Sequence, residues 1–133
     1  GWKTDLILET HDAFCDTRTV LELFDAAGAP MPLIWDSHHT WKLGKEPLMA
    51  TWSALRDSVK HVHYKDSISQ PSARHPYTYV LPGDGEFPSQ ELFSLLSREG
   101  FAGPISLEWE KQWHPELPDL SLALEKARQI AGW

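Results

Sequence analysis

The sequence of 133 residues is poor in cysteine, in basic residues and in long hydrophobic runs. Cys15 is the single cysteine, so an intramolecular disulfide is excluded, and no stretch approaches the roughly 18 apolar residues of a membrane span. Twelve Lys and Arg stand against 19 Asp and Glu, and no basic stripe offsets the net charge of -7. A polyanion would be repelled. The sequence therefore predicts a soluble cytoplasmic protein that binds neither nucleic acid nor membrane.

Hydrophobic residues make up 41% of the chain and include seven Trp, which is enough for one compact core. We expect a single domain over residues 1–133, built from strand–helix units. The predicted units cover about residues 4–28, 32–57, 59–100 and 104–131. Because strands that alternate with helices form parallel sheets, all the strand C-termini should meet at one edge. The long connection over residues 65–87 is predicted to be a functional loop.

The predicted helices have recognisable start and stop signals. Asp16 or Thr17 can cap the first helix, Gly28 can end it, and Pro47 can open the second. Each helix carries a stripe of residues expected to face the core. The stripes are Val20, Leu21, Phe24 and Ala27; Leu48, Thr51, Trp52 and Leu55; Leu92, Phe93, Leu95 and Leu96; and Leu120, Leu124, Ala127 and Ile130.

A side chain able to bind metal stands at the end of every predicted strand. These residues are Glu9, Asp36, His63 and Glu108, and the first three are spaced 27 residues apart. Three carboxylates and one imidazole suit Mn²⁺ or Mg²⁺, and they can also take Co²⁺ or Zn²⁺. Such a site can hold the oxygens of a hydroxy-ketone while a carboxylate moves a proton beside the carbonyl. This chemistry is isomerisation or epimerisation.

Each of these residues also has a purely structural explanation. An acid at a strand end, such as Asp36, can be the N-cap of the next helix, and a lone histidine in a strand, such as His63, can be a satisfied core residue. The ordered set of four favours a site over these separate explanations. His61 and His63 should point the same way because they alternate along a strand. His38 is assigned to the surface of a polar loop.

Five short motifs carry a resemblance to a known family. They occur in the order seen in the sugar phosphate isomerase/epimerase superfamily of xylose-isomerase-like TIM barrels. The motifs are Leu8-Glu9-Thr10-His11-Asp12, Trp35-Asp36-Ser37-His38-His39, Val62-His63-Tyr64-Lys65-Asp66, Gly83-Asp84-Gly85 and Ile105-Ser106-Leu107-Glu108-Trp109. The chain resembles the C-terminal half of a (β/α)8 barrel, strands five to eight.

The resemblance implies roles for individual residues. The four strand-end residues would bind one divalent metal ion, with Glu9 and Glu108 also acting as the acid/base pair. His39, from the Asp-x-x-His motif, would contact the substrate. Lys65, from the His-x-Lys-Asp motif, and His11 are assigned to substrate binding as well.

Two departures from the family patterns bear on the alternatives. Ser69 stands where sugar 3-epimerases of this type carry a substrate-binding arginine, so a related isomerase or a keto-inositol-type dehydratase competes with a 3-epimerase. The second departure instead argues against an alternative. Ala73-Arg74-His75 lacks the aspartate of the trinuclear zinc centre found in the related DNA-repair endonucleases, and together with the acidic charge this disfavours DNA repair. A half-barrel that only binds metal or ligand is the remaining alternative.

A TIM barrel usually takes about 250 residues. A half-barrel would leave strand edges and an inner face uncovered, which favours aggregation of a free monomer. We therefore expect two kinds of partner, a small sugar or polyol substrate and a second half-barrel. The second half would come from the N-terminal part of a longer chain or from a second copy.

Overall fold

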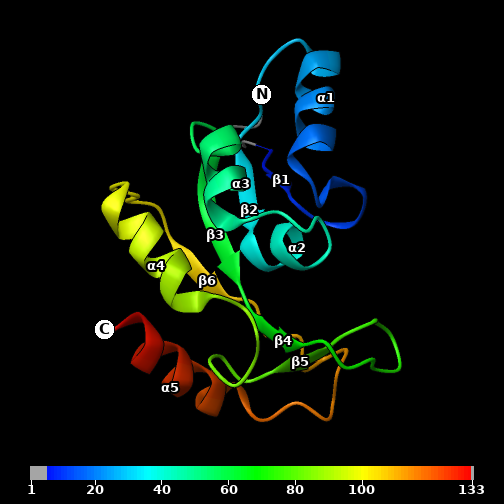
Figure 1. Cartoon of the computed structure of the whole chain (residues 1–133), viewed down its shortest axis with the longest axis vertical. Coiled ribbons are helices and arrows are strands. Elements are labelled where there is room, and N and C mark those ends of the chain that lie inside the picture. Colours follow the sequence, from blue (N-terminus) through cyan, green and yellow to red (C-terminus); the bar gives the residue numbers. More distant parts are fainter. Residues whose placement is uncertain (1–5, 133) are drawn as a thin grey trace, which may run out of the picture. The chain divides into compact units, whose positions relative to one another are not determined.

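The computed structural model describes residues 6–132 and shows an α/β fold (Figure 1). It contains two compact units. The first comprises the described residues up to His63 together with Gly103–Ile105, and the second comprises Tyr64–Ala102 and the described residues from Ser106. Over residues 6–132, one sheet has its strands in the order β1 (Leu8–Glu9), β2 (Leu33–Asp36), β3 (Val59–Tyr64) and β6 (Ile105–Leu107). The four predicted strands and four predicted helices occur in the predicted order, with α2 (Ser37–Lys42), β4 (Asp66–Ile68) and β5 (Thr78–Val80) among the additional elements. The start of the first strand at Thr4 lies outside the described residues.

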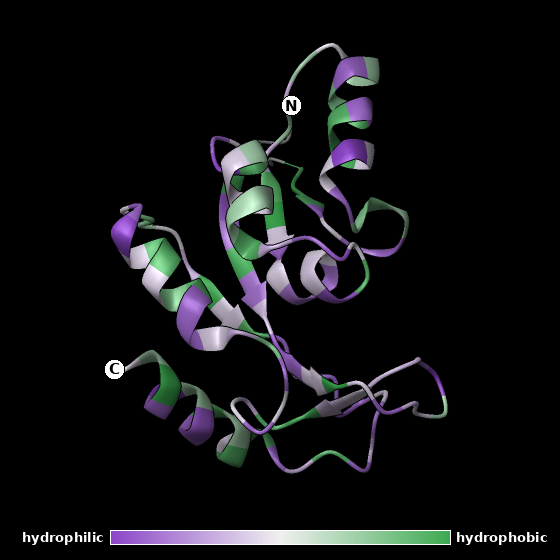
Figure 2. Ribbon diagram, in the orientation of Figure 1, coloured by the Kyte–Doolittle hydropathy of each residue, from purple (hydrophilic) through white to green (hydrophobic). Residues whose placement is uncertain are grey.

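In the first unit, β1, β2 and β3 pair in parallel. One face of these strands is apolar, and Leu33, Trp35 and Val62 are fully buried there. The Trp35 ring lies 5.8 Å from the ring of Trp52 on α3 (Leu48–Leu55). All four residues predicted for the buried stripe of α3 are buried. Figure 2 shows β2 hydrophobic where it begins and hydrophilic where it ends.

Helix α1 (Thr17–Ala27) has the predicted ends. The Asp16 carboxylate accepts a hydrogen bond of 2.9 Å from the Thr19 N–H, and Gly28 ends the helix at φ 74°. Val20 and Phe24 are buried, as predicted, whereas Leu21 and Ala27 are exposed. The prediction was wrong for Leu21 because it is turned about 100° from Val20 around the axis and leaves the buried stripe. Ala27 lies on the side of Val20 and Phe24, but it is the last residue of the helix.

The polar segment after β2 is a helix, α2 (Ser37–Lys42), where a loop was predicted. Asp36 caps it, because Oδ1 accepts the His39 N–H at 2.8 Å. The assignment of His38 to the loop surface was therefore wrong. His38 lies in the helix and is fully buried. Six polar and aromatic residues are too few to show a helical period in the sequence.

The second unit contains two helices and an antiparallel pair of strands. Helix α4 (Ser89–Arg98) buries Leu92, Leu95 and Leu96, as predicted. Helix α5 (Leu120–Ala131) buries Ala123 and Ala127. Ala127 is buried as predicted, whereas Leu120 and Leu124 are exposed, so the predicted stripe was wrong for these two leucines. Ala123, which was not predicted, is buried in their place. None of the helices within residues 6–132 is long and apolar enough to cross a membrane.

Within the connection predicted as a loop, β4 (Asp66–Ile68) and β5 (Thr78–Val80) form an antiparallel pair. The Asp66 carboxylate anchors the glycine-rich segment that follows. It accepts backbone N–H groups from Gly83, Gly85 and Phe87 at 2.9–3.0 Å, and from Ser67 at 2.8 Å. One buried side chain thus holds the glycine-rich part of the connection in place.

Candidate metal site

Glu9, Asp36 and His63 lie on one face of the sheet in the first unit. Glu9 pairs with Ile34, two residues before Asp36, and Asp36 pairs with His63. Because paired residues share a face and side chains alternate along a strand, the register puts all three on the same side. One potential ligand atom from each lies within 4.8 Å of the others. The structure therefore brings together three of the four predicted ligands.

The Glu9 and His63 side chains meet directly. His63 Nδ1 lies 3.0 Å from Glu9 Oε1, and the ring of His61 lies edge-on to that of His63 at 4.8 Å. The expectation that both histidines point the same way is confirmed. Burial, followed by the charge of His63, lowers the pKa of His61. Near neutral pH, His61 is thus an uncharged neighbour of the ligand set.

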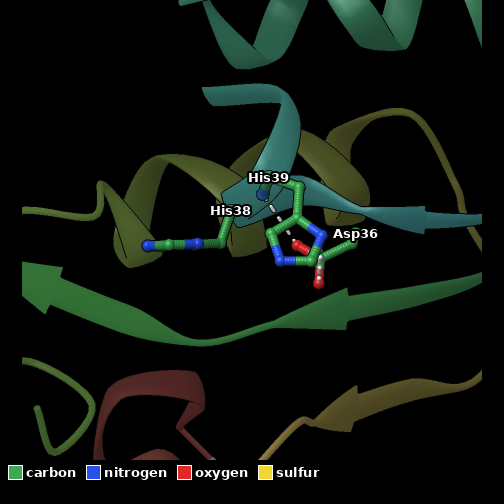
Figure 3. Close-up of side chains that lie close together, drawn as sticks. All are labelled: Asp36, His38 and His39. Carbon is green, nitrogen blue, oxygen red and sulfur yellow. Dashed lines mark hydrogen bonds and ion pairs between the residues drawn. The ribbon is translucent and has the colours of Figure 1, made fainter. Parts of the chain in front are cut away.

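Asp36 is fully buried. Its Oδ1 caps α2, and its Oδ2 lies 3.4 Å from His39 Nδ1. Figure 3 shows the His39 ring against the Asp36 carboxylate, with the His38 side chain pointing away from it. Asp36, His38 and His39 also offer ligand atoms within 4.8 Å of one another. Asp36 is thus shared by both groups of potential ligands.

The two histidines predicted to contact substrate lie side by side. The rings of His11 and His39 are edge-on at 4.6 Å. His39 Nδ1 lies 3.3 Å from the Thr10 carbonyl oxygen, an arrangement in which Nδ1 carries the proton and donates it. Nε2 is then the ring atom that can accept a hydrogen bond from a ligand. His11 is exposed and near Asp12, at 3.1 Å.

The buried Lys65 forms an ion pair with the partly exposed Glu108 in the second unit. Lys65 is 1% exposed, and its Nζ donates to Glu108 Oε2 at 2.5 Å and to Glu110 Oε1 at 2.9 Å. Nζ also lies 5.4 Å from the centre of the Tyr79 ring. Burial and the hydrogen bond between its hydroxyl group and that of Tyr77 raise the pKa of Tyr79, so this phenol stays protonated. Glu108 as the fourth ligand remains a prediction.

Sequence reasoning missed Glu110 and Tyr79. The signal for Glu110 was its spacing, because residues 108 and 110 share a side in an extended segment. Thr78-Tyr79-Val80 has the β-branched and aromatic character of a strand, but Pro71, Pro76 and Pro82 around it favoured a loop.

Comparison with known proteins supports the fold. The sequence model of the xylose isomerase-like TIM barrel matches residues 3–130. The chain belongs to this family. The predicted half-barrel and the family resemblance are thus confirmed. No curated protein matches this xylose isomerase-like chain.

Three solved structures share the fold of this xylose isomerase-like chain at low sequence identity. A probable 3-DHS dehydratase, AsbF, involved in petrobactin synthesis from Bacillus anthracis is 20% identical, with a TM-score of 0.70 over 95% of this chain and 49% of its own. A 3-keto-D-glucoside 4-epimerase, YcjR, from E. coli is 18% identical, with a TM-score of 0.58 over 89% and 38%. A xylose isomerase domain protein from Planctomyces limnophilus is 19% identical, with a TM-score of 0.61 over 97% and 46%. The chain thus spans half or less of each structure.

Proposed function

We propose that this chain supplies the metal-binding half of a divalent-metal-dependent isomerase or epimerase acting on a sugar or sugar phosphate. The convergence of Glu9, Asp36 and His63 at the ends of three adjacent strands carries the proposal. Two carboxylates and an imidazole fit a hard or borderline cation, Mn²⁺ first, with Mg²⁺, Co²⁺ or Zn²⁺ as alternatives. Glu108 is the proposed fourth ligand, from the end of β6.

The proposed reaction moves a proton beside a carbonyl. The bound cation would polarise the substrate carbonyl. Glu9 removes the proton from the adjacent carbon, and Glu108 returns a proton from the opposite side. His39 and His11, which lie together, orient the substrate hydroxyl groups, and Lys65 holds Glu108 in place.

A keto-inositol-type dehydratase is the second candidate, and the buried Lys65 favours it. Elimination begins with the same proton removal, but a hydroxyl group on the next carbon then leaves as water and needs a proton. An ammonium group 2.5 Å from Glu108 is suited to assisting that departure. AsbF, a probable 3-DHS dehydratase, provides a precedent for such chemistry on this fold. A barrel half that binds ligand without turnover is the third candidate.

We further propose that the remaining strands of the barrel come from another part of a longer chain or from a second copy. The match of this chain to about half of the AsbF structure supports this proposal. Size-exclusion chromatography with light scattering tests pairing between copies, and a clean monomer contradicts that arrangement. A cytoplasmic location remains a prediction.

Calorimetric titration with Mn²⁺ tests the proposed function. We expect one Mn²⁺ per chain, with binding lost in Asp36→Asn and kept in Glu22→Gln, which alters an exposed carboxylate on α1. A panel of ketoses and keto-inositols then separates isomerisation from dehydration by the products formed. Lack of stoichiometric Mn²⁺ binding contradicts the metal site, whereas Mn²⁺ binding without turnover of any substrate favours the ligand-binding alternative.

A further inference from the structure

We infer that the hydroxyl groups of Thr10 and Ser37 are positioning devices for the metal-binding face. This inference rests on the proposed metal site. Both residues are fully buried, and each directly follows a proposed ligand in the sequence, Glu9 and Asp36 respectively. Neither side chain belongs to the ligand set.

Thr10 joins the end of β1 to the end of β2. Backbone hydrogen bonding between these two strands extends to Thr10, whose N–H donates to the Ile34 carbonyl oxygen at 3.0 Å. Beyond it, Thr10 Oγ1 accepts the Asp36 N–H at 2.8 Å and donates to the Asp36 carbonyl at 3.3 Å. The Thr10 hydroxyl thus continues the strand pairing in place of a backbone group. It holds both the N–H and the carbonyl oxygen of Asp36.

Ser37 makes the corresponding connection between β2 and β3. Its Oγ donates to the His63 carbonyl at 2.8 Å. The backbone of His63 is thereby tied to the residue next to Asp36, beyond the end of the β2 strand. The two hydroxyl groups therefore join the three ligand-bearing strand ends into one frame.

This frame matters because a metal site tolerates little displacement of its ligands. Groups that orient ligands typically contribute about 10- to 100-fold to metal affinity. Both Thr10 and Asp36 are fully buried. Without the Thr10 hydroxyl, the Asp36 N–H would lose the acceptor that Thr10 provides, and the end of β2 would have to shift to find another acceptor. The expected loss is in metal affinity, beyond the ordinary loss of stability.

Thr10→Val tests the inference because it removes the hydroxyl and keeps the shape. Thr51→Val is the matched control, since Thr51 is also fully buried in the same unit and its Oγ1 donates to Glu46 Oε2 at 2.7 Å, away from the ligands. Mn²⁺ affinity and thermal stability are measured on the full chain for both variants, for Thr10→Ser and for Ser37→Ala.

We expect Thr10→Val and Ser37→Ala to weaken Mn²⁺ binding about 10-fold or more, Thr10→Ser to restore it, and Thr51→Val to lower stability alone. Equal Mn²⁺ affinity in Thr10→Val and Thr51→Val overturns the inference and leaves the proposed function intact. If the unaltered chain binds no Mn²⁺ at all, the proposed metal site fails and the inference fails with it.

Discussion

The Nδ1 atom of His63 lies 3.0 Å from the Oε1 atom of Glu9, although the two residues are 54 positions apart in the chain. A proton shared across this distance connects the two side chains when no cation is bound. A cation that takes the same nitrogen must move that proton to Nε2 or to the solvent. Because protons compete with a cation for carboxylate and imidazole ligands, metal binding should weaken as the pH falls.

Replacing Glu9 by Gln removes the charge from this pair. We expect Glu9→Gln to lower Mn²⁺ affinity at least about 10-fold, since changes to groups that merely orient ligands already cost this much. Titration calorimetry at fixed pH measures the effect. Glu22→Gln is the control, and an unchanged Mn²⁺ affinity in Glu9→Gln would show that Glu9 is not a ligand.

Asp66 is expected to stabilise the second unit through its four backbone hydrogen bonds. In Asp66→Asn an amide N–H₂ would face N–H donors, and we expect the free energy of unfolding to fall by about 2 kcal/mol or more. Urea denaturation measures it. Asp84→Asn, in an exposed pair with Lys126, should change the free energy by less than about 1 kcal/mol. Similar losses in the two variants would contradict the anchoring role.

Gly85 has no room for a side chain. A Cβ atom there would lie 2.1 Å from Asp66 Oδ1 and 2.7 Å from the Ser67 carbonyl oxygen, so Gly85→Ala must displace the glycine-rich segment. Gly100 has φ +69° with nothing within 4 Å of a Cβ, and Gly100→Ala should cost about 1 kcal/mol. We expect a clearly larger loss for Gly85→Ala in thermal unfolding. Equal losses would mean that the contact with Asp66 is easily relaxed.

The cap of α1 should show a defined pH dependence. The backbone N–H of Thr19 lowers the pKa of Asp16 from its usual 3.8, because it stabilises the ionised carboxylate. This contribution to stability is present above pH 3.8 and is lost as the pH falls through the lowered pKa. Asp16→Ala should cost about 1 kcal/mol near neutral pH.

The comparison variant for this cap is Asp25→Ala, on the exposed part of the same helix, with an expected effect within about 0.5 kcal/mol. Denaturant titrations at several pH values measure both. An Asp16→Ala penalty that persists undiminished well below pH 3.8 would contradict a charged cap.

The strand ends and helix caps were predictable from the sequence because each depends on a few adjacent residues. Asp16 and Gly28 act as the cap and the stop of α1, and the strands end at Glu9 and Asp36 as predicted. Helix α2 was not predictable, since its cap, Asp36, looks the same whether a short helix or a loop follows.

Contacts distant in the sequence were beyond such reasoning. The bond of Lys65 to Glu110 and that of Thr10 to Asp36 depend on which strand ends meet, and periodicity does not specify this. The exposure of Leu120 and Leu124 also depends on how deeply α5 packs, which an apolar stripe alone does not determine.

The pairing of β2 with β3 contains a register shift. Leu33 pairs with Val59, but Ile34 pairs with His61, so one residue of β3 is skipped. An unbroken register would put Val62 opposite Asp36 and turn His63 out of the ligand set. The bulge in β3 therefore takes up one extra residue and keeps His63 in the ligand set. Deleting Lys60 removes that residue and leaves His63 opposite Asp36 in the shortened strand, so Mn²⁺ binding in titration calorimetry should persist in this deletion as well as in Lys60→Ala.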